Sequence, residues 1–229
     1  MLLLIGIFFM VLSLIVGWML KMRFNQYSEL PLRIGLSGKE IAEKMLHDYG
    51  IYDVKIVSVP GKLTDHYNPA DKTVNLSPEV YSGRSISAAA VAAHECGHAV
   101  QHATAYRWLQ MRSALVPVVQ VSTSILNFIF LGSMILGLGF HMFNSETMLT
   151  IIVAAQAFIT LFSIVTLPVE FDATRRGLAW LNRAGITYGE EQTKAQDALR
   201  LAAMTYVIAA LYALSNLIYF VLRLLNSRE

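Results

Sequence analysis

Four long runs of apolar residues dominate this 229-residue sequence and restrict what it can fold into. Each run reaches the roughly 20 residues that an α-helix needs to cross the hydrocarbon core of a bilayer. The runs cover residues 1–20, 114–140, 148–167 and 203–222. Only 15% of all residues are charged, whereas a soluble domain carries about 25%. The sequence therefore predicts a mainly α-helical, polytopic membrane protein with about four transmembrane helices.

The distribution of basic residues predicts the orientation of these helices. Of the 18 Lys and Arg residues, 16 lie between the first and second runs or between the third and fourth, and two follow the fourth run. The short segment 141–147 contains none. Because Lys and Arg are enriched on the cytoplasmic side, we expect both large segments in the cytoplasm and both termini outside. The predicted location is the cell (inner) membrane, with residues 1–20 as an uncleaved anchor.

Net charge and cysteine content narrow the partners and the covalent chemistry. The formal net charge is only +2, and no basic patch is interleaved with aromatic residues, so no nucleic-acid partner is expected. Cys96 is the single cysteine, which rules out a disulfide within the chain. The expected surroundings are the lipid bilayer and a membrane protein or peptide, and the sequence leaves the oligomeric state open.

The segment after the first run has the pattern of a small folded α+β unit. Ser37-Gly-Lys-Glu40 is a capping box that opens a short amphipathic helix. Residues 53–59 alternate between polar and β-branched apolar side chains, which predicts a strand. The remaining predicted elements are a strand at Thr73–Leu76, a helix from near Ser85 or Ser87 to Thr104, and helical segments at 171–182 and 189–201.

The helix that ends near Thr104 carries the segment His94-Glu95-Cys96-Gly97-His98. Residues four apart project from one face of a helix, so both imidazoles can bind one Zn²⁺ ion. Glu95 lies about 100° around the helix from His94, where it can take a proton from a zinc-activated water as general base. Two histidines on one face also occur as ordinary polar groups. The uncharged neighbours predict a buried helix, however, and buried imidazoles beside a carboxylate need partners.

A catalytic zinc site needs a third protein ligand, and Glu170 is the best candidate. It lies where the third apolar run ends, on the same predicted side as the two histidines, and a carboxylate at a membrane boundary is costly unless it is paired or functional. The alternative is that Glu170 and Asp172 form a polar helix exit paired with Arg175 and Arg176. The remaining candidates fit less well: His102 lies a further turn along the helix, His141 falls on the opposite predicted side, and a helix N-terminus explains Glu190 and Glu191. His66 lies in a predicted loop and His47 on the amphipathic helix.

The motif His94-Glu-Cys-Gly-His98, followed by Glu170-Phe-Asp-Ala-Thr-Arg-Arg-Gly177, resembles the YugP-like membrane zinc metallopeptidases over nearly the whole chain. It is more distantly similar to the HtpX and CAAX-prenyl-protease gluzincins. The resemblance implies endopeptidase activity with Glu170 as third zinc ligand. Thr174 stands where the distant families place an aspartate that orients a zinc histidine, and Asp172 is a candidate for that role.

Together these observations predict a membrane-bound zinc endopeptidase with one Zn²⁺ per chain and a small cytoplasmic zincin-like unit. The expected regions are 1–20 (anchor), 21–113 (zincin-like region), 114–167 (second and third spans), 168–202 (helical region with the third ligand) and 203–229 (fourth span and tail). We expect substrates to be membrane-associated proteins or peptides, which an extended pairing with Thr73–Leu76 would hold. Tyr67, Tyr81, Tyr188, Arg175 and Arg176 are candidate oxyanion donors.

Three alternatives stay open. The first is a zinc-binding membrane scaffold without proteolytic activity. The second is a site-2-type intramembrane protease in which residues 85–106 form a span, but this topology distributes the basic residues less asymmetrically. The third is a structural membrane protein without zinc.

Overall fold

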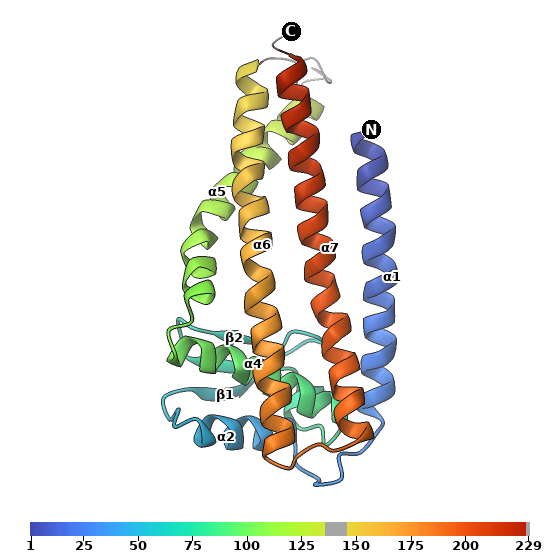
Figure 1. Cartoon of the computed structure of the whole chain (residues 1–229), viewed down its shortest axis with the longest axis vertical. Helices are drawn as coiled ribbons and strands as arrows, with labels where there is room; N and C mark the ends of the chain where they lie inside the picture. Colours follow the sequence, from blue (N-terminus) through green and yellow to red (C-terminus); the bar gives the residue numbers. More distant parts are fainter. Residues whose placement is uncertain (136–145, 228–229) are drawn as a thin grey trace. The chain divides into compact units, whose positions relative to one another are not determined.

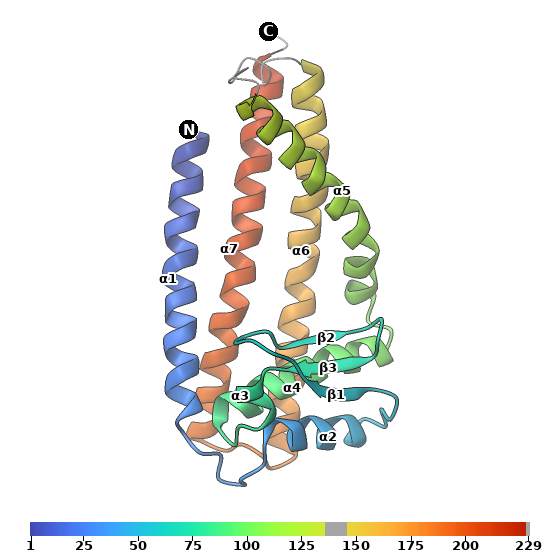
Figure 2. The ribbon, with the colours of Figure 1, turned by 180° about the vertical axis from the view of Figure 1, so that it is seen from behind.

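The structure is a computed structural model that describes residues 1–135 and 146–227. The end of the second predicted span and the segment around His141 lie outside the described residues. The elements are α1 (Leu2–Ser28), α2 (Gly38–Asp48), β1 (Lys55–Ser58), β2 (His66–Asn68), β3 (Thr73–Leu76), α3 (Pro78–Tyr81), α4 (Ile86–Ala103), α5 (Arg107–Ile135), α6 (Glu146–Arg183) and α7 (Glu190–Asn226). Figures 1 and 2 show them from opposite sides.

Four described helices, α1, α5, α6 and α7, are long and apolar enough to cross a membrane, which confirms the predicted spans at this level. All four extend beyond the predicted apolar runs: α1 continues to Ser28, α5 already begins at Arg107, and α6 and α7 extend furthest. The third run continues through Pro168 to the end of α6 without a break, and the predicted helix at 189–201 is continuous with the fourth run as α7. No glycine or proline separates 201 from 203, so the helix has no local reason to end there.

The chain divides into two compact units, each built from segments that are distant in sequence. The helical unit contains residues 1–14, 110–167 and 206–229, and the mixed unit contains residues 15–109 and 168–205. Within the helical unit, Gln156 Nε2 and Thr160 Oγ1 of α6 each donate a hydrogen bond of 3.1 Å to the Ala213 carbonyl of α7. Large apolar side chains such as Phe8 and Phe128 remain exposed, as expected for helices whose solvent is lipid.

The mixed unit packs its helices around a small sheet. The predicted capping box is confirmed: Ser37 Oγ accepts from the Glu40 N–H, and the Glu40 carboxylate accepts from the Ser37 N–H, at the start of α2. Apolar residues of α2, α4 and the sheet form the main core, and Figure 2 shows the three strands beside α4. Cys96 lies in this core, where burial raises the pKa of its thiol, as expected for a small core residue.

The sheet has the strand order β1-β3-β2, with β1 parallel and β2 antiparallel to β3. Thr73–Leu76 is a strand as predicted, whereas β1 is shorter than the predicted 53–59. The expectation that Thr73–Leu76 accepts an extended substrate is wrong, because β3 is the central strand and both of its edges are already paired. The edge strand β2 and the short helix α3 were not predicted, since three or four residues carry too little periodicity.

Two glycines let α4 and α6 approach closely within the mixed unit. A Cβ atom on Gly97 of α4 would lie 2.5 Å from the Ala173 carbonyl oxygen of α6. A Cβ atom on Gly177 of α6 would lie 2.8 Å from the Ala93 carbonyl oxygen and 3.1 Å from the His94 nitrogen of α4. These obstacles are backbone atoms, which cannot rotate away as a side chain can. Both positions therefore require glycine at this helix spacing.

We predict that Gly177→Ala destabilises the protein by about 1–3 kcal/mol, because the added methyl group forces α4 and α6 apart. Thermal unfolding in detergent should show a lower midpoint for this variant. Gly17→Ala in α1 is the control: nothing lies within 4 Å of its added Cβ atom, and alanine favours the helix. Equal midpoints for Gly177→Ala and wild type would contradict the close approach described above.

Candidate metal centre

Helix α4 places two imidazoles on one face. Its first turn is capped by Ser85, whose hydroxyl accepts from the Ala88 N–H at 3.2 Å, and the following alanine-rich turns are buried in the mixed unit. His94 and His98 follow one turn apart, with ring centroids 4.8 Å from each other. Both side chains are largely buried. The helix therefore holds two nitrogen ligands side by side.

Helix α6 brings the Glu170 carboxylate to the same point. Glu170 Oε2 lies 3.4 Å from His94 Nε2 and 3.5 Å from His98 Nε2. The candidate ligand atoms of these three residues all lie within 4.8 Å of one another. The structure thus brings together the three residues that the sequence singled out, although Glu170 is 72 positions after His98. Asp172 is the carboxylate that pairs with Arg175 and Arg176.

The arrangement fits a tetrahedral zinc ion. With metal–ligand bonds of about 2.0–2.1 Å, two ligand atoms of a tetrahedron lie about 3.3–3.4 Å apart. The two nitrogen–oxygen distances of 3.4 and 3.5 Å are close to that value. Two imidazoles and one carboxylate also match the ligand chemistry of catalytic zinc sites, which leave the fourth position open.

Gln101 fixes which nitrogen of His98 faces this point. The Gln101 amide donates to the Val169 carbonyl at 2.8 Å and to Asp172 Oδ2 at 3.0 Å, so its Oε1 atom faces His98 Nδ1 at 3.0 Å. Since Oε1 only accepts, His98 Nδ1 carries the hydrogen and Nε2 has the lone pair. A lone pair directed at a carboxylate is repulsive unless a cation or a proton lies between them.

Thr174 orients the other histidine. Its hydroxyl lies 3.1 Å from His94 Nδ1, which leaves His94 Nε2 directed at Glu170. Thr174 thus contacts the histidine directly from the position where the distant families have aspartate. Asp172 acts one step further away, through Gln101 and towards His98. Gln101 was missed in the sequence, where its only signal was a polar residue three positions after His98 in an otherwise apolar helix.

The pKa shifts of His98 and Glu170 also indicate that the site favours a positive charge. Burial lowers the pKa of the His98 imidazole, but Glu170, together with the charge of Glu95 and the hydrogen bond to Gln101, raises it by more, so the net pKa is raised. Burial alone would raise the pKa of the Glu170 carboxyl, and the two imidazoles lower it well below its usual range. The site therefore favours a carboxylate with a positive charge between it and the imidazoles.

The other candidate residues lie elsewhere in the described structure. His102 Nδ1 is 2.7 Å from the Tyr67 hydroxyl, and His66 Nδ1 is 2.8 Å from the Thr64 carbonyl oxygen. Neither belongs to the group around Glu170, and neither do His47, Glu190 and Glu191. Glu95 is buried on α4 beside the pair, and its carboxylate has no hydrogen bond or ion pair to the part of the chain that the structure describes.

The comparisons with known proteins agree with the geometry. The family described as "Putative neutral zinc metallopeptidase" matches residues 2–225. The chain is also 40% identical over 209 residues to "Putative membrane protease YugP" of Bacillus subtilis (strain 168), covering 91% of this chain and 90% of that protein. No solved structure matches the chain. The chain belongs to this neutral zinc metallopeptidase family, as the resemblance seen in the sequence implied.

We predict that Thr174→Val weakens zinc binding about 10–100-fold, because the methyl group cannot hydrogen-bond to His94 and the imidazole loses its orientation. A competition titration with a fluorescent zinc chelator measures this change. Thr193→Val is the matched control, since the Thr193 hydroxyl donates to the exposed Gly189 carbonyl just before α7. Unchanged affinity in Thr174→Val would show that the hydroxyl has no part in orienting His94.

Proposed function

We propose that this protein is a membrane-bound, zinc-dependent endopeptidase of the gluzincin type, in which His94, His98 and Glu170 hold one zinc ion per chain. The convergence of two Nε2 atoms on Glu170 Oε2, at 3.4 and 3.5 Å, is the observation that carries the proposal. The family assignment supports the choice of zinc and of peptide hydrolysis. The mixed unit then serves as a small zincin-like unit built around α4.

Zinc bound by these residues would lower the pKa of a water molecule and polarise the carbonyl group of a peptide. Glu95 is placed to accept the proton of the attacking water, because it lies on the helix turn between the two histidines. Its carboxylate has no hydrogen-bonding partner in the described residues, so its lone pairs are available for that proton. The same group can then deliver the proton to the leaving amine.

The mixed unit also offers a place for an extended substrate backbone. Strand β2 pairs on one side with β3, and α4 lies against the same sheet (Figure 2). Among the described residues, no strand pairs with the other side of β2. A peptide added there would be held by main-chain hydrogen bonds, which suits an endopeptidase that must accept the interior of a chain. The proposed backbone contact is therefore His66–Asn68 and not Thr73–Leu76.

The substrates we propose are membrane proteins or membrane-associated peptides on the cytoplasmic side. In sequence, Glu170 follows the apolar stretch 148–167 by only three residues of the same helix. The positively charged segments that carry the site support a cytoplasmic location for it and an outside location for both termini. This proposal places the protein in the cell (inner) membrane as a multi-pass enzyme.

Two alternatives make different demands on the structure. A site-2-type protease needs α4 as a membrane span, but α4 is buried in the mixed unit and is not among the four described helices that qualify as spans. A zinc-binding scaffold without activity needs the metal but not Glu95. Glu95 therefore separates the enzyme from the scaffold.

We predict that Glu95→Gln retains zinc but lowers peptide cleavage by about 10²–10⁴-fold, because glutamine cannot accept the proton. Metal analysis and a quenched-fluorescence peptide assay on the protein in lipid nanodiscs measure the two properties. Glu43→Gln, at an exposed site on α2, is the control and should keep both. Zinc binding by a wild-type protein that cleaves no peptide, soluble or membrane-tethered, would favour the scaffold.

The orientation is tested by labelling introduced cysteines with a membrane-impermeant maleimide. The native Cys96 is buried, so it contributes little background. We predict that Ser227→Cys is labelled in intact cells, whereas Tyr188→Cys is labelled only after the membrane is opened. Both residues are exposed within their own units, so accessibility in the folded chain is not limiting. The reverse labelling pattern would place the site outside.

A further inference from the structure

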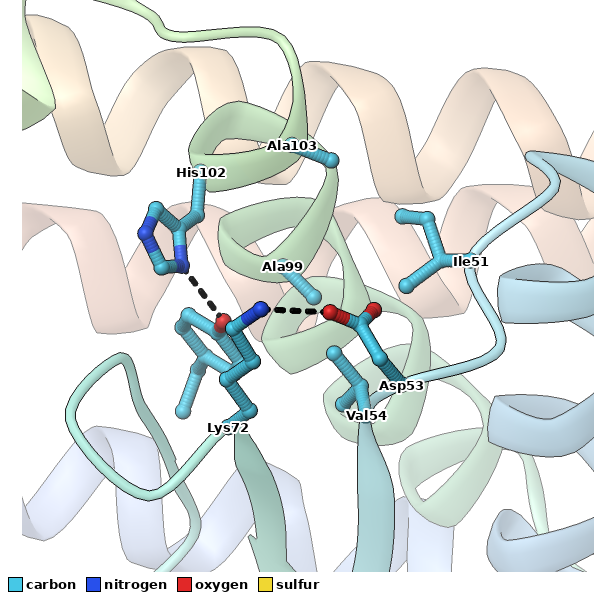
Figure 3. A pocket seen from close by; sticks show the side chains of 8 residues that line it. Ile51, Asp53, Val54, Lys72, Ala99, His102 and Ala103 are labelled. Atoms are coloured by element: carbon cyan, nitrogen blue, oxygen red, sulfur yellow. Dashed lines mark hydrogen bonds and ion pairs between the residues drawn. The ribbon is translucent and has the colours of Figure 1, made fainter.

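A small cavity of about 160 Å³ lies at the end of the sheet, beside the last turns of α4 (Figure 3). Four of its lining residues are aliphatic. Ala99 and Ala103 of α4 form one side, and Ile51 and Val54, which precede β1, form another. An apolar cavity of about 150 Å³ is large enough to hold a benzene molecule. The cavity therefore has the size and lining for one leucine, methionine or phenylalanine side chain.

The polar groups of this cavity are already paired with each other. Lys72 Nζ forms an ion pair of 2.5 Å with Asp53 Oδ2 (Figure 3), and the Tyr67 hydroxyl lies 2.7 Å from His102 Nδ1. Because the two opposite charges neutralise each other, the cavity presents no unpaired charge to an incoming group. This pairing favours an uncharged occupant.

The cavity is a continuation of the face of α4 that carries the proposed general base. Glu95, Ala99 and Ala103 are spaced four residues apart and so project from neighbouring positions of one helix face. The two alanines lie one and two turns after Glu95, about 6–12 Å along the helix axis. An extended peptide advances about 3.3 Å per residue, so this distance corresponds to about two to four residues of substrate.

Tyr67 connects the cavity to the edge strand. It is the central residue of β2, and its hydroxyl contacts His102 of α4. In a peptide paired beside β2, successive side chains point to opposite faces of the sheet. The substrate residue beside Tyr67 would therefore direct its side chain to the α4 face, where the cavity lies.

We propose that this cavity is a specificity pocket that receives an uncharged leucine-, methionine- or phenylalanine-sized side chain of the substrate, about two to four residues from the scissile bond. The assignment rests on the proposed peptidase function and adds a substrate class to it. Substrates with such a residue at that position are then preferred over those with alanine or a charged residue.

The test is a variant that fills the pocket without touching the metal centre. Ala103 is exposed to the cavity, and Ala103→Leu occupies the space of the substrate side chain. With peptides that vary one position at a time, we expect the preference for leucine over alanine, as a ratio of kcat/KM, to fall at least about tenfold at a single position. Ala70→Leu, an exposed site outside the pocket, should leave that ratio unchanged.

A second variant changes the pocket in the opposite direction. Val54→Ala enlarges it and should shift the preference at the same position towards phenylalanine and tryptophan. Cleavage with an unchanged preference in both variants overturns the pocket and leaves the peptidase function intact. A wild-type protein that holds zinc but cleaves no member of the peptide set overturns the peptidase function, and the pocket assignment with it.

Discussion

The backbones of α4 and α6 approach each other so closely in the mixed unit that two positions must have no side chain. Gly97 faces the Ala173 carbonyl group, and Gly177 faces the peptide between Ala93 and His94. His94 and His98 lie on α4 next to these contacts, and Glu170 of α6 lies within 3.5 Å of both Nε2 atoms. A methyl group at either contact would widen the spacing, and a wider spacing would move the carboxylate away from both Nε2 atoms. The candidate metal centre thus depends on a packing constraint that lies outside its proposed ligands.

This close approach also concentrates groups that repel one another. The lone pair of His98 Nε2 and the Glu170 carboxylate face the same small volume beside His94 Nε2, in a protein interior where electrostatic interactions are poorly screened. Gln101 and Thr174 hold the imidazoles in that orientation, and Arg175 and Arg176 hold Asp172, which in turn anchors Gln101. The surrounding hydrogen bonds therefore maintain an arrangement that only a cation or a proton relieves. This is the physical reason to read the cluster as a metal centre and not as ordinary polar packing.

Around this centre, the mixed unit combines a strand edge that no described strand pairs with, a general-base candidate and a cavity lined by aliphatic and mutually paired polar side chains. Each can be traced to local sequence. Glu95, Ala99 and Ala103 follow from helical spacing, and the small size of the two alanines leaves the cavity open beside Ile51 and Val54. A peptide that lies along β2 would pass these features in order. The proposed function therefore uses the sheet, which the zinc ligands alone would not require.

The sequence by itself determined the properties that depend on neighbours along the chain. Four apolar stretches, the capping box at Ser37, the strand Thr73–Leu76 and the spacing of His94 and His98 are all set within a few residues, and helical or strand periodicity reveals them. Membership of the zinc metallopeptidase family was also visible, because the motif and the later glutamate segment can be recognised without coordinates.

Only the tertiary structure decided which groups surround His94 and His98. Thr174 and Asp172 lie 80 and 71 positions from the residues they contact, and Gly177 matters only because α4 lies against it. The central position of β3 likewise depends on a strand too short to predict. Contacts of this kind arise from long-range packing, for which local periodicity carries no signal.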